Sequence, residues 1–111
     1  MNLNSIIEGN WKTRVVTIDG KVLSPAKSQK VWNHSPDGYS WNYAGSGPSQ
    51  LSLALLLEIT TKEEALKYYQ DFKFDKIATL PPDDFRMTGE EVYEWLLRKR
   101  NNEERAITGS S

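Results

Sequence analysis

The chain has 111 residues, 38% of them hydrophobic, which suits one domain with one modest core. Its 14 Lys and Arg against 15 Asp and Glu give a net charge of −1, which argues against a generally basic nucleic-acid binder and against a strongly acidic mimic of DNA. The absence of cysteine excludes a disulfide scaffold and a cysteine-based metal site, and it is compatible with a reducing compartment.

The N-terminal segment MNLNSIIEGNWK lacks the basic and apolar regions of a signal peptide. The longest apolar run, near Leu51–Leu57, is too short to span a bilayer. We therefore expect a cytoplasmic protein with no membrane partner.

The segment WKTRVVTIDGKVL predicts a β-hairpin. Residues 15–18 favour a strand, and Asp19-Gly20 is typical of a type I′ turn. A second short strand is predicted at 29–33, QKVWN.

Turn chemistry follows in SPDG, residues 35–38, and the next five residues alternate aromatic and polar side chains. This alternation predicts a strand over 39–43. Because successive side chains of a strand point to opposite faces, Tyr39, Trp41 and Tyr43 should share one face.

A buried helix is predicted over residues 48–59, because Pro48 suits a first helical turn and the following residues are almost all apolar. We expect Gly47 or Ser46 to cap it. Three leucines should be largely buried: Leu53, Leu56 and Leu57.

Two further helices are each opened by a predicted capping box, Thr61 with Glu64 and Thr88 with Glu91. The segment LPPDDF, residues 80–85, should break the chain between them. The apolar positions of the two helices are Ala65, Leu66, Tyr69, Phe72 and Ile77 in the first, and Val92, Trp95 and Leu96 in the second.

Strands first and helices after predict an α+β fold: a small antiparallel β-sheet from the N-terminal half, packed against about three α-helices from the C-terminal half. We expect one domain over residues 1–100 and a polar C-terminal tail over 101–111.

The stretch HSPDGYSWNYAGSGPSQLSLALL resembles a family of small proteins from bacteriophages, plasmids and bacterial genomes that is known only as a domain of unknown function. Its pattern runs Ser-Pro-Asp-Gly-aromatic, any residue, Trp-Gly-Tyr-Gly-Gly-Ser-Gly-Pro, a small residue, then Gln-Leu-Ala-Leu-Ala. The resemblance covers roughly residues 11–97, and the chain departs from it at Asn42 and Ala44, where the pattern has glycine. It implies a mobile-element context and no particular activity.

The segment GSGPSQ suggests an anion cradle, because a helix N-terminus presents unpaired N–H groups and a partial positive charge. The aromatic strand beside it would stack a base. The candidate ligand-binding residues are Tyr39, Trp41, Tyr43, Ser46, Gly47, Ser49 and Gln50. The alternative is that the small residues let the helix pack closely and that the aromatics fill the core, and the two interpretations can coexist.

The catalytic inventory is poor, with no catalytic residue, no metal site and no cofactor predicted. His34 is the single histidine, and a structural role suits it best. The basic segment LLRKR, residues 96–100, complements a helix C-terminus, and the glutamates around it weaken the case for nucleic acid. Trp11 and Trp32 can mark a protein interface, although burial is their default.

We therefore expect a non-enzymatic phage-type accessory protein that binds a nucleotide-like anionic small molecule. Sequestering a host immune signal, as an anti-defence protein would, requires tight binding and no catalytic group. The alternative is a protein–protein interaction module that inhibits or adapts a host complex. A homodimer is also expected, in the host bacterial cytoplasm if a phage encodes the chain.

Overall fold

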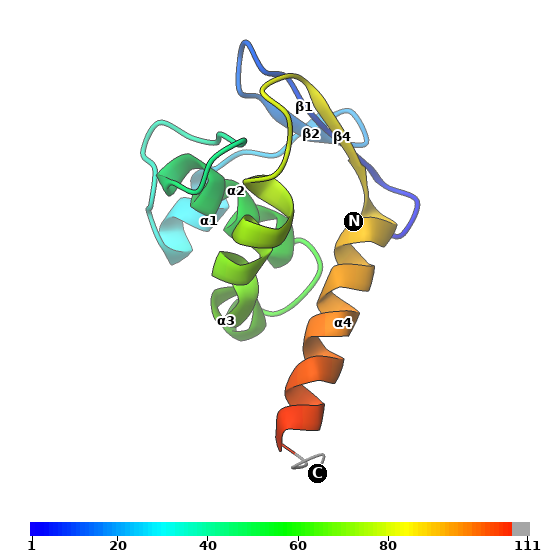
Figure 1. The fold of residues 1–111 in the computed structure, drawn as a ribbon. Coiled ribbons are helices and arrows are strands. Elements are labelled where there is room, and N and C mark those ends of the chain that lie inside the picture. The colour runs from blue at the N-terminus through cyan, green and yellow to red at the C-terminus, as the bar shows by residue number, and fades with distance from the viewer. Residues whose placement is uncertain (108–111) are drawn as a thin grey trace.

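The computed structural model describes residues 1–107, which form a four-stranded antiparallel sheet and a group of helices that extends away from it (Figure 1). The strands, in the sheet order β3-β2-β1-β4, are β3 (Lys21–Val22), β2 (Val16–Ile18), β1 (Ile6–Gly9) and β4 (Phe85–Thr88). The helices are α1 (Ala26–Val31), α2 (Ser46–Leu57), α3 (Lys62–Phe72), its π-helical continuation η1 (Lys73–Ile77), and α4 (Gly89–Ile107). The predicted α+β class is confirmed.

The predicted hairpin is formed by β2 and β3. Its turn residues Asp19 and Gly20 have φ angles of 53° and 80°, the left-handed pair that a type I′ turn requires. Asp19 Oδ1 also accepts a hydrogen bond of 2.9 Å from the N–H of Ile6, which ties the turn to β1.

Two predicted strands are wrong. Most of residues 29–33 belongs to the end of α1 and its C-cap, and residues 39–43 form an irregular segment. Asn42 interrupts that segment with a left-handed φ of 76°. The alternating aromatics therefore reflect loop side chains that point in different directions, and not one face of a strand.

Two short strands, β1 and β4, were not predicted, because four residues carry too little periodicity to be distinguished from a loop. They pair antiparallel, with Ile7 opposite Met87 and Gly9 opposite Phe85. The sheet therefore joins the N-terminal segment to the residues that directly precede α4. The predicted break at 80–85 ends in β4 and not directly in a helix.

Helix α2 is the centre of the core and contacts α1, α3 and η1. It begins at Ser46, two residues before the predicted start, with Gly45 as N-cap. Every residue from Gly47 to Leu56 is buried, whereas Leu57 is only partly buried. The predicted buried helix is confirmed, with less burial at its end than expected.

Both predicted capping pairs are present. Thr61 Oγ1 accepts from the N–H of Glu64 at 3.2 Å. Thr88 and Glu91 cap each other, because each side chain accepts from the other residue's backbone N–H. These contacts fix the first turns of α3 and α4.

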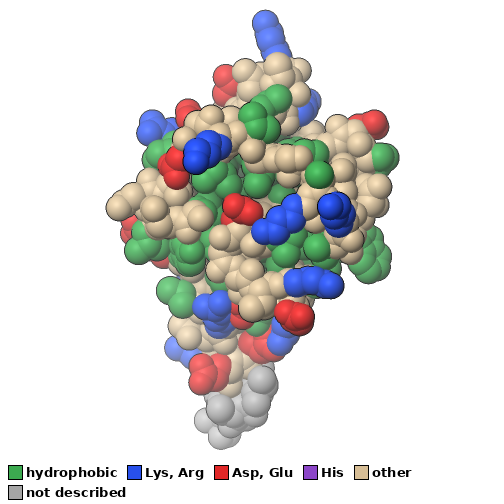
Figure 2. All heavy atoms as spheres, turned by 180° about the vertical axis from the view of Figure 1, so that it is seen from behind, with side chains coloured by type: hydrophobic (Ala, Val, Ile, Leu, Met, Phe, Trp, Pro, Cys, Tyr) green, Lys and Arg blue, Asp and Glu red, His purple; other side chains and the backbone are tan. Residues whose placement is uncertain are grey.

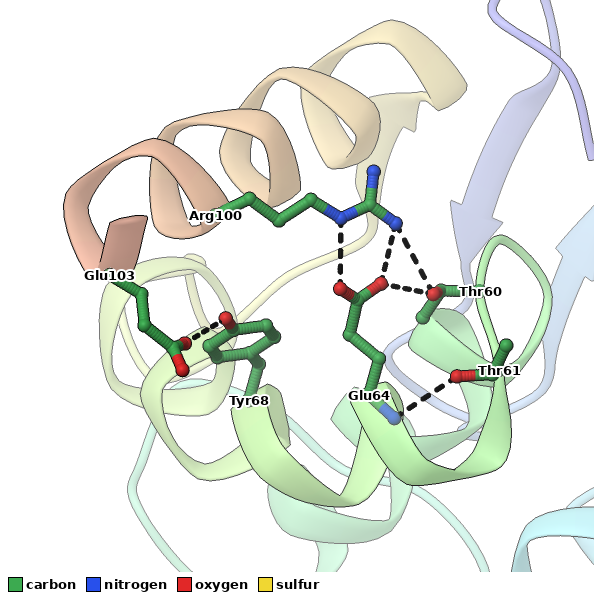
Figure 3. Close-up of polar contacts among 6 residues, drawn as sticks. All are labelled: Thr60, Thr61, Glu64, Tyr68, Arg100 and Glu103. Carbon is green, nitrogen blue, oxygen red and sulfur yellow. Dashed lines mark hydrogen bonds and ion pairs between the residues drawn. The ribbon is translucent and has the colours of Figure 1, made fainter. Parts of the chain in front are cut away.

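A polar network joins the second half of α4 to α3 (Figure 3). The Nε of Arg100 donates to the Glu64 carboxylate at 2.9 Å, and Thr60 donates to the same carboxylate. One turn further, Tyr68 donates to Glu103. The bond from Arg100 is the main reason why the pKa of Glu64 lies below its ordinary value.

Helix α4 continues through residues 101–107 of the predicted tail, and residues 108–111 lie outside the described part. The narrow end of the molecule carries both acidic and basic side chains (Figure 2). Within residues 1–107, no helix has both the length and the apolar character to cross a membrane.

Candidate functional site

The predicted ligand-binding residues do not line one open site. Five of them are buried and two are exposed: buried are Tyr39, Trp41, Gly47, Ser49 and Gln50, and exposed are Tyr43 and Ser46. The start of α2 therefore offers few reachable groups to a ligand.

Trp41 is a core residue. Its ring lies edge-on to Phe85 with centroids 4.8 Å apart, and it contacts Trp11 at 5.7 Å. Its Nε1 donates to the backbone oxygen of Asp83 at 2.9 Å. With its surface covered and its N–H bonded, Trp41 has no free face on which a base can stack in this structure.

Gly47 provides close packing at the start of α2. A Cβ at this position would lie 2.7 Å from Cβ of Ser40 and 3.0 Å from its backbone nitrogen. The N–H of Ser49 is also occupied, because it donates to the oxygen of Gly45 at 3.0 Å. These contacts favour the packing interpretation of the GSGP segment.

Asn42 occupies a position where the resembling family has glycine, and its left-handed φ gives a physical reason for that glycine. Its backbone N–H donates to the oxygen of Ile77, and its Nδ2 donates to the oxygen of Leu80 at 2.7 Å. Asn42 thus keeps the loop conformation, and its side chain adds a bond to the segment that follows η1.

Tyr39 lies buried with its hydroxyl oxygen unpartnered among the described residues. Burial raises the pKa of this hydroxyl, and the charge of Glu58 adds to the effect. The hydroxyl therefore stays neutral at physiological pH.

Gln50 holds the segment that precedes the SPDG turn. Its Oε1 accepts from the N–H groups of His34 at 2.8 Å and Ser35 at 3.0 Å. Its Nε2 donates to Ser28 Oγ at 2.9 Å and to the oxygen of Trp32 at 3.1 Å. A fully buried amide thereby positions Trp32 and His34 at the surface.

The structure brings together a surface that was not predicted from the sequence, here called the aromatic surface. It consists of Trp32, His34, Tyr69, Lys73 and Phe74. The Trp32 and His34 rings stack with centroids 5.6 Å apart, and His34 Nε2 lies 2.7 Å from the hydroxyl of Tyr69. Lys73 Nζ lies 4.4 Å from the centroid of the Phe74 ring.

The two ends of the aromatic surface are exposed and its middle is buried. Trp32 and Phe74 each keep 57% of their surface accessible, whereas Tyr69 and Lys73 are buried. Trp32 was named as an interface candidate from the sequence. No pattern of neighbouring residues indicates that it lies close to residues of α3.

The π-helical turn η1 explains the exposure of Phe74. Lys73 and Ile77 of this turn are buried, while Phe74 between them points to solvent. Single π-helical turns are rare and often occur at functional sites.

The electrostatics of the aromatic surface keep His34 neutral. Burial lowers the pKa of its imidazole, and the positive charge of Lys73 lowers it further. A neutral ring that stacks on Trp32 and is hydrogen-bonded to Tyr69 is suited to packing against a partner and not to binding an anion.

Within residues 1–107, no group of three His, Cys, Asp or Glu side chains is placed to hold a metal ion. His34, the single histidine, is hydrogen-bonded to the hydroxyl of Tyr69. This pair differs from the serine–histidine–carboxylate arrangement of a nucleophilic catalytic site.

Comparison with known proteins gives one family. A model described as a family of unknown function (DUF6166) matches residues 8–98. No curated protein and no solved structure matches the chain.

Proposed function

The chain belongs to this family of unknown function (DUF6166), and from its structure we propose that it is a non-enzymatic interaction module that binds a partner protein through the aromatic surface. The observation that carries the proposal is the exposure of Trp32 and Phe74 at the two ends of a cluster in which His34 is partly buried and Tyr69 and Lys73 are buried. Large aromatic side chains of this kind dominate the energy of protein interfaces.

The rigidity of the aromatic surface supports this function. Gln50 bonds to the backbone on both sides of Asn33, and stacking on His34 restrains the Trp32 ring. An aromatic side chain that is already ordered loses little conformational entropy when a partner covers it. Lys73 beside Phe74 adds a positive charge, so we expect a partner that presents apolar side chains with an acidic group nearby.

The resemblance to phage and plasmid proteins supports the setting that we propose for this interaction. The partner would be a host complex in the bacterial cytoplasm, which the module inhibits or adapts, and an immune-defence complex is included in this class. The structure gives less support to a nucleotide-like ligand at the start of α2. Trp41 is covered by Phe85, and Gly47 packs against Ser40.

The proposal is tested by comparing what the protein and its variants retain from a bacterial lysate. Trp32→Ala with Phe74→Ala removes both exposed rings. Tyr43→Ala is the matched control, because Tyr43 is also an exposed aromatic residue, at 51%, and lies against Gly45 outside the aromatic surface.

We expect one specific protein to be retained by the parent and by Tyr43→Ala, and to be lost by the double variant. Calorimetry with the purified partner should then show an affinity loss of more than about 2 kcal/mol for the double variant. Equal retention by all three proteins, or by none, would contradict the proposal.

A further inference from the structure

A second surface lies between η1 and α4. This groove, here called the η1–α4 groove, has a volume of about 390 Å³. It is lined by Asp75, Lys76, Trp95, Arg98, Lys99 and Asn102. None of these residues belongs to the aromatic surface.

The cations of the η1–α4 groove exceed its carboxylates. Lys76, Arg98 and Lys99 face one lining carboxylate, Asp75. That carboxylate is engaged, because its Oδ2 accepts from Nε1 of Trp95 at 2.8 Å. A neighbouring carboxylate outside the lining, Asp71, pairs with Lys99 at 3.0 Å.

Lys76 and Arg98 are therefore the cations of the groove that are available to bind an anion. Within residues 1–107 neither makes an ion pair, and they come from different elements that face each other across the groove. Trp95, which is almost fully buried, lines the groove beside them, and Lys99 Nζ lies 5.8 Å from the centroid of its ring.

We propose that the η1–α4 groove binds a phosphate group. The guanidinium of Arg98 presents a planar fork of N–H donors that matches two phosphate oxygens. Lys76 supplies a point charge from the opposite wall, and the amide of Asn102 supplies a neutral donor one turn further along α4. The site requires no residue of the GSGP segment and is independent of the aromatic surface.

The phosphate can come from a free phosphate ester or from the backbone of a nucleic acid, and the experiment distinguishes the two. The indole N–H resonance of Trp95 is followed by NMR in the full chain, at constant ionic strength set with sodium chloride. Three probes are titrated separately: inorganic phosphate, adenosine monophosphate and a short single-stranded DNA. The other three tryptophans do not line the groove and act as internal references.

We expect a saturable shift of the Trp95 resonance. The double variant Lys76→Gln with Arg98→Gln should raise the apparent Kd about tenfold or more, because it removes two charge-assisted contacts. Lys30→Gln with Lys62→Gln is the matched control, since both lysines are exposed and lie outside the groove. Thermal melts establish that all variants are folded.

The probes then assign the source. Saturation by inorganic phosphate or adenosine monophosphate supports a free phosphate ester, and saturation by the DNA alone supports a nucleic-acid backbone. The proposal is overturned if no probe produces a saturable shift of Trp95, or if the groove variant binds as tightly as the parent.

Discussion

At the scale of single residues, a polar side chain of α2 makes hydrogen bonds that hold the neighbouring loop in place. The amide of Gln50 is fully buried and makes four hydrogen bonds, three of them to the backbone of residues 32–35. A buried polar group is stable only when its hydrogen bonds are made. Gln50 therefore determines where Trp32 and His34 emerge at the surface, without touching a partner itself.

Gln50→Leu should lower the free energy of unfolding by about 2–4 kcal/mol, because it removes the acceptor of the Ser35 N–H and one of the two acceptors of the His34 N–H. Urea denaturation measures the loss. Ser46→Ala, an exposed position one turn earlier in the same helix, should change stability by less than about 0.5 kcal/mol. A loss below about 1 kcal/mol for Gln50→Leu would show that water replaces the amide.

Gly47→Ala tests the close approach of α2 to Ser40. Alanine favours a helix over glycine by about 1 kcal/mol, yet its Cβ would lie 2.7 Å from Ser40 Cβ. We expect a net destabilisation of about 1–3 kcal/mol in a urea melt. Ser40→Gly should recover part of this loss, and a gain in stability for Gly47→Ala alone would contradict the packing interpretation.

The pH dependence of stability reports on His34. The pKa of His34 in the folded protein lies below the ordinary value of 6.5. Below pH 6.5 the unfolded chain therefore binds a proton at His34 more readily than the native protein does. This stability is complete above pH 6.5 and is lost as the pH falls from there toward the lowered pKa, by at most about 1.4 kcal/mol per pH unit.

NMR titration of the single histidine checks this prediction, with a midpoint expected below 6.5. Lys73→Met should move the midpoint upward, because the charge of Lys73 contributes to the shift. Lys76→Met, a neighbouring lysine that lines the η1–α4 groove, is the control and should leave it unchanged. A midpoint at or above 6.5 in the parent would contradict the prediction that the pKa of His34 is lowered in the folded protein.

At the scale of elements, α4 is held in two different ways along its length. Near its start, Val92, Trp95 and Leu96 are buried in the core. Further along, Arg100 and Glu103 make hydrogen bonds and ion pairs to α3 (Figure 3). The second half of α4 therefore depends on charge, and salt screens charge but not apolar burial.

A double-mutant cycle on Glu64 and Arg100 should give a coupling of about 0.5–1.5 kcal/mol at low salt, because the guanidinium donates to both carboxylate oxygens. The coupling should fall at high salt. Lys27 and Glu58 form the control pair: their atoms are 3.6 Å apart and the Lys27 side chain is 69% exposed, so their coupling should be near zero. Equal couplings for the two pairs would contradict the role given to the α3–α4 network.

At the scale of the whole molecule, the fold is elongated, with principal extents of 48 × 28 × 23 Å, because α4 runs from the sheet past the other helices (Figure 1). The π-helical turn η1 lies between two different surfaces. Phe74 belongs to the aromatic surface, and Asp75 and Lys76 face α4. One turn of backbone thus contributes to both the aromatic surface, which we propose binds a protein, and the charged η1–α4 groove.

Two exposed aromatic rings also predict self-association when no partner is present. We expect light scattering at high micromolar concentration to report a homodimer, a mass about twice the 12.7 kDa of one chain. Trp32→Ala with Phe74→Ala should return the protein to a monomer, and Tyr43→Ala should not. A monomer at that concentration for the parent would end the dimer prediction and leave the aromatic surface to a different protein.

Features encoded by neighbouring residues were predictable from the sequence. The Asp19-Gly20 turn, the Thr61 and Thr88 caps and the buried helix α2 each depend on residues within one or two turns of chain. Local backbone geometry and local hydrogen bonds decide such features, so their patterns are readable without a fold.

Only the tertiary structure decided which side chains meet. Pairing of β1 with β4 joins segments almost 80 residues apart in the chain, and it covers Trp41 with Phe85 so that an expected stacking platform becomes core. His34 meets Tyr69 across 35 residues, and Asp75 meets Trp95 across 20 residues. Burial and long-range contacts depend on the packing of the whole chain, and no local pattern records them, which is why the aromatic surface and the η1–α4 groove emerged only from the folded molecule.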